Sequence, residues 1–399
     1  MASRTTPRVW FAASTGRAVL ELETAAGTVR TICVLPGEPA ALAASPDETW
    51  LYVAGSVGTG RLWTVSLAEG KVVREARIGH SPAALVVSPD GATLYVCDRF
   101  AGRLRVLHAA DGRQRAELPM PREPIACALT PDGRRLVVVN HLPMGAATET
   151  VVSIEAIVVD TAAGEVAAAI RLPNGCTCGR GVAVSPDGRF AYITSVLGRF
   201  TLPTTQLDRG WMMTAALSVI DVAAGRLVNT VLLDEIDRGA ANPWGVAVSP
   251  DGRRLVVAHA GTHELSVVDR AKLHERLERV GRGEAVTPVS VRPESVPNDL
   301  AFLVDIRERI RLPGNSSCAV AITGGRACAG MYFTDEAAIV DLGAPGARPR
   351  SVRLGPEVPM SVARRGEMLF HDAALCFQEW QSCASCHPTG GWMRSTGIC

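Results

Sequence analysis

Residues 82–98 read Pro-Ala-Ala-Leu-Val-Val-Ser-Pro-Asp-Gly-Ala-Thr-Leu-Tyr-Val-Cys-Asp, two short apolar runs joined by a Ser-Pro-Asp-Gly turn. Proline fixes φ and glycine tolerates positive φ, so this tetrapeptide closes a tight turn between two antiparallel strands. The string S/T-P-D-G/E recurs at four other places: Ser45–Glu48, Thr130–Gly133, Ser185–Gly188 and Ser249–Gly252. Each copy lies between apolar runs, so the stretch is one unit of a repeat.

A third apolar run, a second turn and a fourth run usually follow each copy, which predicts a four-stranded antiparallel sheet. Asp47 and Asp90 are 43 residues apart, and Asp90 and Asp132 are 42 apart, which is the length of one propeller blade. One blade cannot bury both of its faces, so several must stack around an axis. We count seven blades, which begin near residues 8, 37, 80, 122, 178, 242 and 314.

Two of these blades are irregular. The first lacks its innermost strand, and the last, Cys318–Leu354, keeps the pattern but loses Pro-Asp. Over residues 8–355 the repeats resemble the YVTN-type seven-bladed β-propeller family. The predicted fold is all-β, a seven-bladed β-propeller of four-stranded antiparallel blades, followed by a short helical fragment over residues 359–399.

Insertions between the repeats mark where function is expected. Residues 140–152, 196–214 and 232–243 lie in links that open on the same mouth of a propeller, and function concentrates on loops carried by a rigid scaffold. The insertion at about 270–312 differs, because Ala271–Val280 has helical spacing. We expect it to pack outside the ring, with a second short helix within Asn298–Ile310.

The charge balance excludes some classes of partner. Lys plus Arg number 41 and Asp plus Glu 40, which argues against nucleic-acid binding. No stretch of 18 apolar residues predicts a transmembrane helix, and the N-terminus has no apolar run typical of a signal peptide. The 11 cysteines are an odd number, and Cys33, Cys97 and Cys127 lie in apolar runs, so we predict no disulfide scaffold.

Residues 383–387 read Cys-Ala-Ser-Cys-His, the attachment motif of c-type haem. Two thiols one helical turn apart reach the two vinyl groups on one edge of the porphyrin, and the adjacent imidazole then binds the iron. The sequence therefore predicts covalent haem c at Cys383 and Cys386, with His387 as the metal ligand.

The preceding residues extend this prediction. Pro359-Met360-Ser361 can begin a helix that carries Gly366 and Phe370 one turn apart, and a G-x-x-L-F helix before C-x-x-C-H resembles class I cytochrome c domains. The string 364–388 resembles the dihaem cytochrome c peroxidase family, in a branch where this domain follows a YVTN propeller. The resemblance implies that Cys383, Cys386 and His387 match the first haem site, while nothing in the chain matches the second.

Other interpretations of these residues stay open. The motif could be half of a zinc site, with His371, Cys376 and Cys399 as the nearest further ligands. His141, His259 and His263 lie at or near links on the inserted mouth and could approach the haem as ligand or base, although a lone loop histidine is more often structural. Cys176 and Cys178 are interpreted as structural or incidental, and Met360 and Met368 as helix-packing residues.

The chain is expected to be truncated after its first haem motif. Only 12 residues follow His387, and they do not continue the family pattern D-G-R-x-D-x-L-N-W-D-L. One choice of codons for Thr389–Cys399, shifted by one base, encodes D-G-R-M-D-A-L-N-W-D-L, which indicates a frameshifted gene. At the other end, a start further upstream would supply both an export signal and the missing strand, unless a later segment completes the first blade.

Two functions are consistent with these observations. The first is a haem-binding electron-transfer protein of the cytochrome c peroxidase-like class, which meets a redox partner protein or a small oxidant. Because haem c is attached outside the cytoplasm, a periplasmic or other extracytoplasmic location is expected. The second is a non-catalytic β-propeller binding module with a vestigial haem segment, because a propeller ring supports many unrelated functions. Catalysis by this truncated chain is not expected.

Overall fold

The computed structural model describes residues 1–146, 148–200, 212–344, 346, 348–356 and 358–387. The first four sheets contain β1 Arg8–Ala13, β2 Ala18–Glu23, β3 Thr28–Val34, β4 Pro39–Ala44, β5 Trp50–Gly55, β6 Arg61–Ser66, β7 Lys71–Arg77, β8 Pro82–Val87, β9 Thr93–Asp98, β10 Arg103–His108, β11 Gln114–Pro119, β12 Pro124–Leu129, β13 Arg135–Asn140, β14 Glu155–Asp160 and β15 Glu165–Arg171.

The other three sheets contain β16 Cys176–Val184, β17 Phe190–Gly198, β18 Met213–Asp221, β19 Arg226–Leu232, β20 Pro243–Val248, β21 Arg254–His259, β22 Glu264–Asp269, β23 Arg307–Arg311, β24 Ser317–Thr323, β25 Arg326–Met331, β26 Glu336–Asp341 and β27 Arg350–Arg353. The helices are α1 Arg270–Gly281, η2 Pro293–Asn298, α2 Val362–His371, η3 Ala373–Leu375, η4 Phe377–Glu379 and α3 Cys383–Cys386. No helix within the described ranges is long and apolar enough to cross a membrane.

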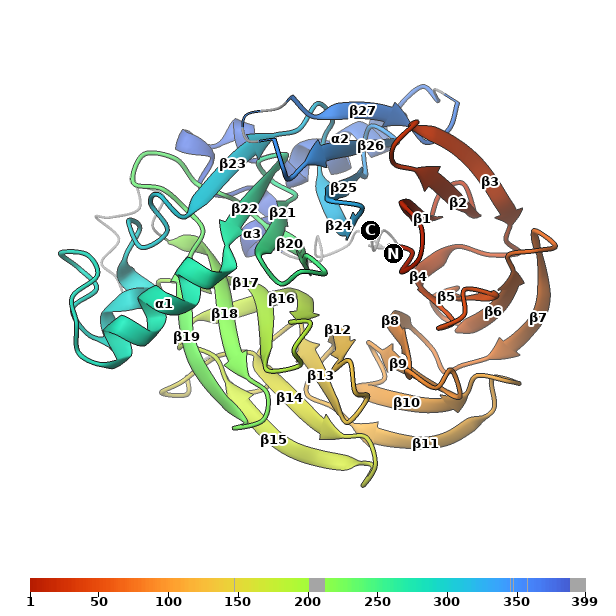
Figure 1. Ribbon diagram of the computed structural model, residues 1–399, viewed down its shortest axis with the longest axis horizontal. Coiled ribbons are helices and arrows are strands. Elements are labelled where there is room, and N and C mark those ends of the chain that lie inside the picture. The colour runs from red at the N-terminus through yellow and green to blue at the C-terminus, as the bar shows by residue number, and fades with distance from the viewer. Residues whose placement is uncertain (147, 201–211, 345, 347, 357, 388–399) are drawn as a thin grey trace.

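The strands form seven sheets around a central axis, which confirms the seven-bladed β-propeller (Figure 1). Each sheet is an antiparallel meander in chain order, and in the four-stranded sheets the first strand lies nearest the axis and the last strand lies outside (Figure 1). Six sheets have four strands, and blade 1 has three, as predicted. Residues 1–3 run beside β1, where Ala2 pairs with Val9 in an isolated bridge, so this segment partly takes the place of an innermost strand.

The repeated turn explains why the blades form where they do. In residues 88–91 the Gly91 N–H donates to the Ser88 carbonyl at 2.9 Å, and the φ of Gly91 is +73°. The Ser88 hydroxyl bonds the Asp90 carboxylate and accepts the Thr93 N–H at 2.9 Å, which starts the next strand. Hydrogen bonding to Ser88 and the backbone lowers the pKa of Asp90, so this carboxylate stays charged and holds the turn.

The core lies between neighbouring blades. Trp10 and Val19 of blade 1 pack against Leu51 and Trp63 of blade 2, and similar clusters recur around the ring. The ring closes between blades 7 and 1, where a shared cluster includes Val9 and Cys328.

In the insertion after β22, the structure confirms one of the two helices that the sequence predicts. Helix α1 forms as predicted, with Asp269 as its N-cap and Leu273 and Leu277 buried, and it lies on the outside of the ring. The prediction of a second helix within Asn298–Ile310 is wrong. Residues 299–306 form turns, and Arg307–Arg311 is β23, the outer strand of blade 6, while the short helical turn η2 lies just upstream.

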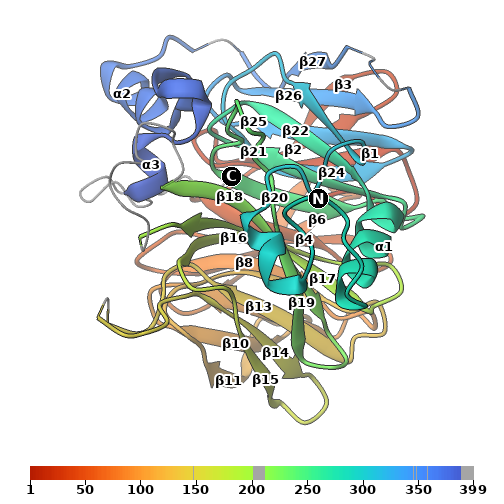
Figure 2. The ribbon, with the colours of Figure 1, turned by 90° about the vertical axis from the view of Figure 1, so that its left-hand side faces the viewer.

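The chain leaves blade 7 and crosses one mouth of the propeller as α2, η3, η4 and α3, on the side of the ring opposite α1 (Figure 2). Helix α2 begins as predicted, because the Ser361 hydroxyl accepts the Arg364 N–H at 3.2 Å. The links 140–152 and 232–243 open on this same mouth. In the third insertion, β17 and β18 extend to Gly198 and from Met213, and residues 201–211 lie outside the described part.

Candidate haem-attachment site

An ionic clamp fixes the C-terminal segment to the propeller. Arg238, from the link between blades 5 and 6, pairs with Glu379 at 3.0 Å, and Arg311 at the end of β23 pairs with the same carboxylate at 3.3 Å. The Gly239 N–H donates to the Gln378 carbonyl at 2.8 Å. Glu379 is therefore held from two sides, just before the haem motif.

The clamped turn is strained and tightly packed. Gln378 and Glu379 both have positive φ, at +50° and +58°, which costs energy for residues that carry a Cβ. A Cβ on Gly239 would lie 2.3 Å from the Trp380 Cα, so only glycine allows this approach. Trp380 is 1% exposed and packs into a core cluster of the propeller with Leu232 and Leu300. The surrounding contacts keep the turn in this conformation.

Asn242 holds α3 itself. Its Nδ2 donates to the Ser382 Oγ at 2.7 Å, and its Oδ1 accepts from the Ser385 Oγ at 2.7 Å. Ser385 and Ala384 are each 2% exposed, so this side of α3 is buried against the ring. The Asn242 amide thus fixes both the position and the rotation of the helix.

The opposite side of α3 presents the residues of the predicted haem motif. Cys383, Cys386 and His387 are exposed, and the His387 N–H closes the helical turn on the Cys383 carbonyl at 2.9 Å. The structure therefore brings the three predicted site residues together on one accessible face. Two thiols one turn apart with the adjacent imidazole fit covalent haem c, which needs the thiols within reach of one porphyrin edge.

The thiols near α3 form a close group. Although Cys386 is exposed as a residue, partial burial of its thiol raises its pKa, and the nearby Cys376 and Cys383 raise it further. Burial likewise raises the pKa of Cys376, helped by Cys383. In the described residues all ten cysteines are free thiols, and no group of three or more His, Cys, Asp or Glu side chains is arranged to hold a metal ion. Cys399, a possible zinc ligand from the sequence, lies outside the described part.

The three loop histidines have structural contacts. His141 and His259 are each 0% exposed, and each Nδ1 donates to a backbone carbonyl, of Gly179 and Ala240, at 2.9 Å. Burial lowers the pKa of His259 to about 4. His263 alone touches the C-terminal segment, because its Nε2 donates to Asp372 at 3.1 Å, so it docks the end of α2.

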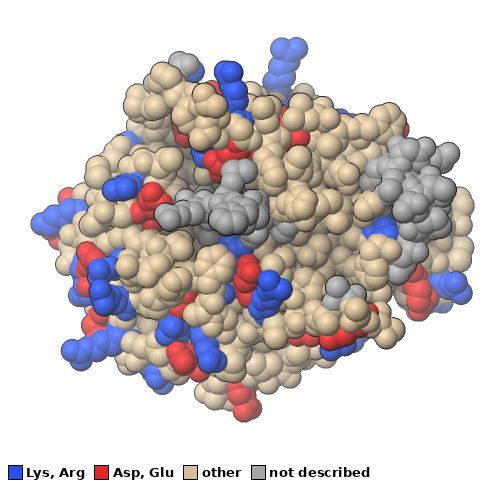
Figure 3. All heavy atoms as spheres, turned by 180° about the vertical axis from the view of Figure 1, so that it is seen from behind, with Lys and Arg blue, Asp and Glu red and all other residues tan. Residues whose placement is uncertain are grey.

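The central channel forms a cavity of about 1110 Å³ beneath α2. The first strands of all seven blades line it, together with residues of the segment that leads into α2. Figure 3 looks at this mouth from outside, and most charged side chains lie toward its edge. His371, at the end of α2, lines the cavity, and burial lowers its pKa to about 4 with help from Arg180 and Arg364.

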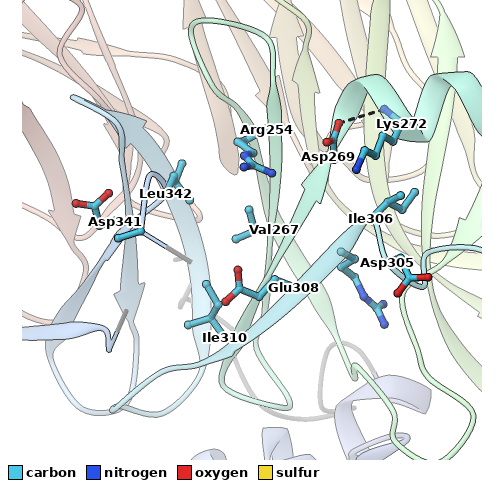
Figure 4. A pocket seen from close by; sticks show the side chains of 12 residues that line it. Arg254, Val267, Asp269, Lys272, Asp305, Ile306, Glu308, Ile310, Asp341 and Leu342 are labelled. Atoms are coloured by element: carbon cyan, nitrogen blue, oxygen red, sulfur yellow. Dashed lines mark hydrogen bonds between the residues drawn. The ribbon is translucent and has the colours of Figure 1, made fainter. Parts of the chain in front are cut away.

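A smaller hollow of about 320 Å³ lies between blades 6 and 7 (Figure 4). Its wall mixes acidic and basic side chains, among them Arg254, Lys272, Glu308 and Asp341. Asp269 also lines it, but its carboxylate accepts the Lys272 N–H at 3.1 Å as the cap of α1. This hollow is away from α3 and has mixed charge, so it adds nothing to the haem-attachment site.

Sequence reasoning missed the residues that hold α3, namely Arg238, Gly239 and Asn242. They lie about 140 positions before the motif, and only folding brings them to it. The sequence did place the insertion 232–243 on the correct mouth of the propeller. It did not predict that this insertion contacts the C-terminal segment.

The fold and the site together define a seven-bladed β-propeller that carries a Cys-x-x-Cys-His helix on one mouth. No known protein-family profile matches the chain. Hydrazine synthase subunit beta of Kuenenia stuttgartiensis is 29% identical over 94 residues, and the match spans about a quarter of that relative, 24% of its length and 24% of this chain. The solved structure of Kuenenia stuttgartiensis hydrazine synthase matches with a TM-score of 0.74 and 20% identity, over 84% of this chain and 92% of that chain. At this identity the likeness supports the fold.

Proposed function

We propose that this chain is a haem-binding electron-transfer protein, with haem c attached through Cys383 and Cys386 and with His387 as the iron ligand. The observation that carries the proposal is the orientation of α3, whose buried side is held by Asn242 while its three haem-attachment residues face outward. When bound, haem supplies reversible one-electron chemistry.

The propeller's part in this function is to fix the site. Glu379, clamped by Arg238 and Arg311, and the buried Trp380 hold the chain that leads into α3. A fixed helix keeps the two thiols and the imidazole in one arrangement. We assign residues 8–355 to the propeller and residues 359–399 to the beginning of a cytochrome c domain of the peroxidase-like class, located outside the cytoplasm.

A redox partner protein is the proposed electron donor or acceptor. Exposed apolar side chains lie in the links that open on the mouth with α3, and Leu375 and Phe377, each 66% exposed, lie beside the motif. Exposed apolar patches mark protein contact sites. The link residues are Val57, Phe100, Met144, Phe200 and Ile236, between 43% and 72% exposed. The curated relative is named as a subunit, so we infer that this chain also acts within an assembly.

Expression in a host with cytochrome c maturation tests the haem site. Wild-type protein should give a pyridine-haemochrome spectrum and a haem mass on the C-terminal peptide, because both thiols are accessible. Cys383→Ala with Cys386→Ala should lose both signals. Cys376→Ala is the matched control, since Cys376 lies near the motif but outside it, and it should keep them. Colourless wild-type protein with no added mass would disprove the proposal.

The second candidate function is a non-catalytic binding module, and the channel of about 1110 Å³ favours it. A chain ending at residue 356 distinguishes the two. If it keeps every partner contact of the full chain, the propeller alone is the functional part, and the haem segment is vestigial.

A further inference from the structure

Two cysteine side chains meet at the interface between blades 3 and 4. Cys97 lies in β9, the second strand of blade 3, and Cys127 lies in β12, the first strand of blade 4. The two strands belong to separate sheets and pack against each other (Figure 1). Both side chains belong to the same core cluster. Neither cysteine is part of the predicted haem motif, so an inference from this pair is independent of the proposed function.

The repeat explains why these two positions meet. The strand registers place equivalent residues at the same point of each blade. Between blades 2 and 3 the equivalent residues are Ala54 and Leu85, which share one core cluster. Between blades 6 and 7 they are Ala258 and Val320, which share another. The fixed backbone of the ring therefore directs both thiols into one interface, and a disulfide requires side chains that point toward each other in this way.

The two thiols differ in their access to solvent. Cys97 is 0% exposed, whereas Cys127 is half-buried and lines the central channel. A hydrogen bond with the Cys127 thiol, together with burial, raises the pKa of the Cys97 thiol well above its usual value. Because the thiolate is the reactive form of cysteine, Cys97 is a poor first nucleophile. A molecule inside the channel therefore meets Cys127 first, with Cys97 directly behind it.

The channel provides a route for a small reagent. Its volume of about 1110 Å³ is large enough for a small organic molecule. The wall around Cys127 is apolar, with Leu85, Ala126 and Val182 from neighbouring inner strands. A neutral organic molecule suits such a wall, because burying apolar surface there is favourable.

We propose that Cys97 and Cys127 are a redox pair, which a small organic disulfide in the channel oxidises to a disulfide between blades 3 and 4. The Cys127 thiolate attacks one sulfur of the organic disulfide, which forms a mixed disulfide and releases one organic thiolate. Cys97 then gives up its proton and attacks the Cys127 sulfur, which releases the second organic thiolate. Each released thiolate takes up one proton. Two protein thiols are thus oxidised, and one organic disulfide is reduced to two thiols.

Non-reducing peptide mapping tests this on the full-length protein, matured as for the haem test. The native protein is treated with hydroxyethyl disulfide, and the remaining thiols are then blocked with N-ethylmaleimide in urea. Trypsin should release residues 78–99 and 123–134 as one linked species, which reduction separates into two peptides. Because the ring holds these two thiols together, this link should form at least about ten-fold faster than a link between any other two cysteines.

Single substitutions test the order of the two steps. Cys97→Ala removes the second thiol, so Cys127 should keep the hydroxyethyl group as a mixed disulfide. Cys127→Ala removes the accessible thiol, so the buried Cys97 should stay unmodified. Cys318→Ala is the matched control, because Cys318 lines the same channel from β24, and it should still give the linked species. Far-ultraviolet circular dichroism should match wild type for every variant.

A stability measurement completes the test. The oxidised wild-type protein should unfold at a higher urea concentration than the reduced protein, because the link restrains the unfolded chain, and Cys97→Ala should show no such difference.

Three outcomes would each overturn the proposal: native wild-type protein that gives no linked species, another cysteine pair that links equally fast, or a Cys97 that reacts as readily without Cys127. The wild-type peptide map decides even where a variant fails to fold. Colourless protein that still forms the link would contradict the haem proposal alone, so the two failures are distinct.

Discussion

At the residue scale, one glycine allows the C-terminal segment to dock on the propeller. Gly239 faces the backbone of the strained turn, where a Cβ would lie 2.3 Å from the Trp380 Cα and 2.5 Å from the Glu379 carbonyl oxygen. Gly239→Ala should therefore push the segment away from the ring. Overpacking of this kind costs about 1–3 kcal/mol, so the undocked fraction should rise by at least about five-fold.

Limited trypsin digestion at Arg364 and Arg365 measures this undocking, because cleavage requires the segment to leave the surface. Gly366→Ala is the control from the same segment, since a Cβ there meets nothing within 4 Å. It should digest at the wild-type rate or more slowly. Equal digestion of wild type and Gly239→Ala would show that the turn does not hold the segment.

The residues of the site also show where sequence reasoning ends. The predicted haem motif Cys383–His387 rests on its spacing alone, which is typical of haem c attachment. Its supports could not be recognised, because Arg238, Gly239 and Asn242 have no local pattern and acquire their role only through a contact across about 140 residues. The sequence suggests His371 only as a zinc ligand, and its place in the channel depends on how α2 crosses the mouth.

At the element scale, α1 depends on its cap. The Asp269 carboxylate accepts the Lys272 N–H at 3.1 Å, at the point where β22 turns into the helix. Asp269→Ala removes this acceptor and should lower the free energy of unfolding by about 1 kcal/mol. Asp269→Ser keeps a capping oxygen and should recover most of the loss. Urea unfolding followed by circular dichroism measures both, and equal losses for the two variants would exclude a capping role.

The insertion that contains α1 shows why the helix predicted at Ala271–Val280 is confirmed and the second helix predicted within Asn298–Ile310 is wrong. Ala271–Val280 places Leu273, Leu277 and Val280 on one buried face, a periodicity visible in the sequence. Arg307–Arg311 is mostly charged, and its polar residues suit an exposed helix as well as an edge strand. It becomes β23 because blade 6 lacks an outer strand, and pairing with β22 supplies the context that local composition cannot.

At the scale of the whole molecule, the closed ring follows from the repeat, but the contacts that close it do not. Seven units that each need a neighbour on both faces predict a closed circle. The contacts that close it are particular ones, such as the Arg350 Nη2 donating to the Thr24 carbonyl at 2.6 Å and the Thr323 hydroxyl donating to the Thr6 carbonyl at 3.1 Å. They join residues more than 300 positions apart, which no local pattern encodes.

The whole ring is expected to lose stability in mild acid. Burial lowers the pKa of His259, His274 and His371 to about 4, from an ordinary value of 6.5. The unfolded chain therefore binds more protons at these imidazoles than the folded chain between these values, so their contribution to stability is full above pH 6.5 and falls as the pH drops toward 4. Asp234 acts in the opposite sense, because burial raises its pKa to about 6. It counts for one proton against at least three, since burial also lowers the pKa of His141 and of His263.

Urea midpoints measured at pH 6.5, 5.5 and 4.5 test the sign, and each excess proton contributes at most about 1.4 kcal/mol per pH unit. His371→Gln should flatten the slope, because it removes one of these buried imidazoles while keeping a polar side chain of similar size. His108→Gln, at an exposed position at the end of β10, should leave the slope unchanged. A midpoint that stays constant or rises between pH 6.5 and 4.5 would mean that the buried imidazoles are already charged in the native ring, against the burial that lowers their pKa.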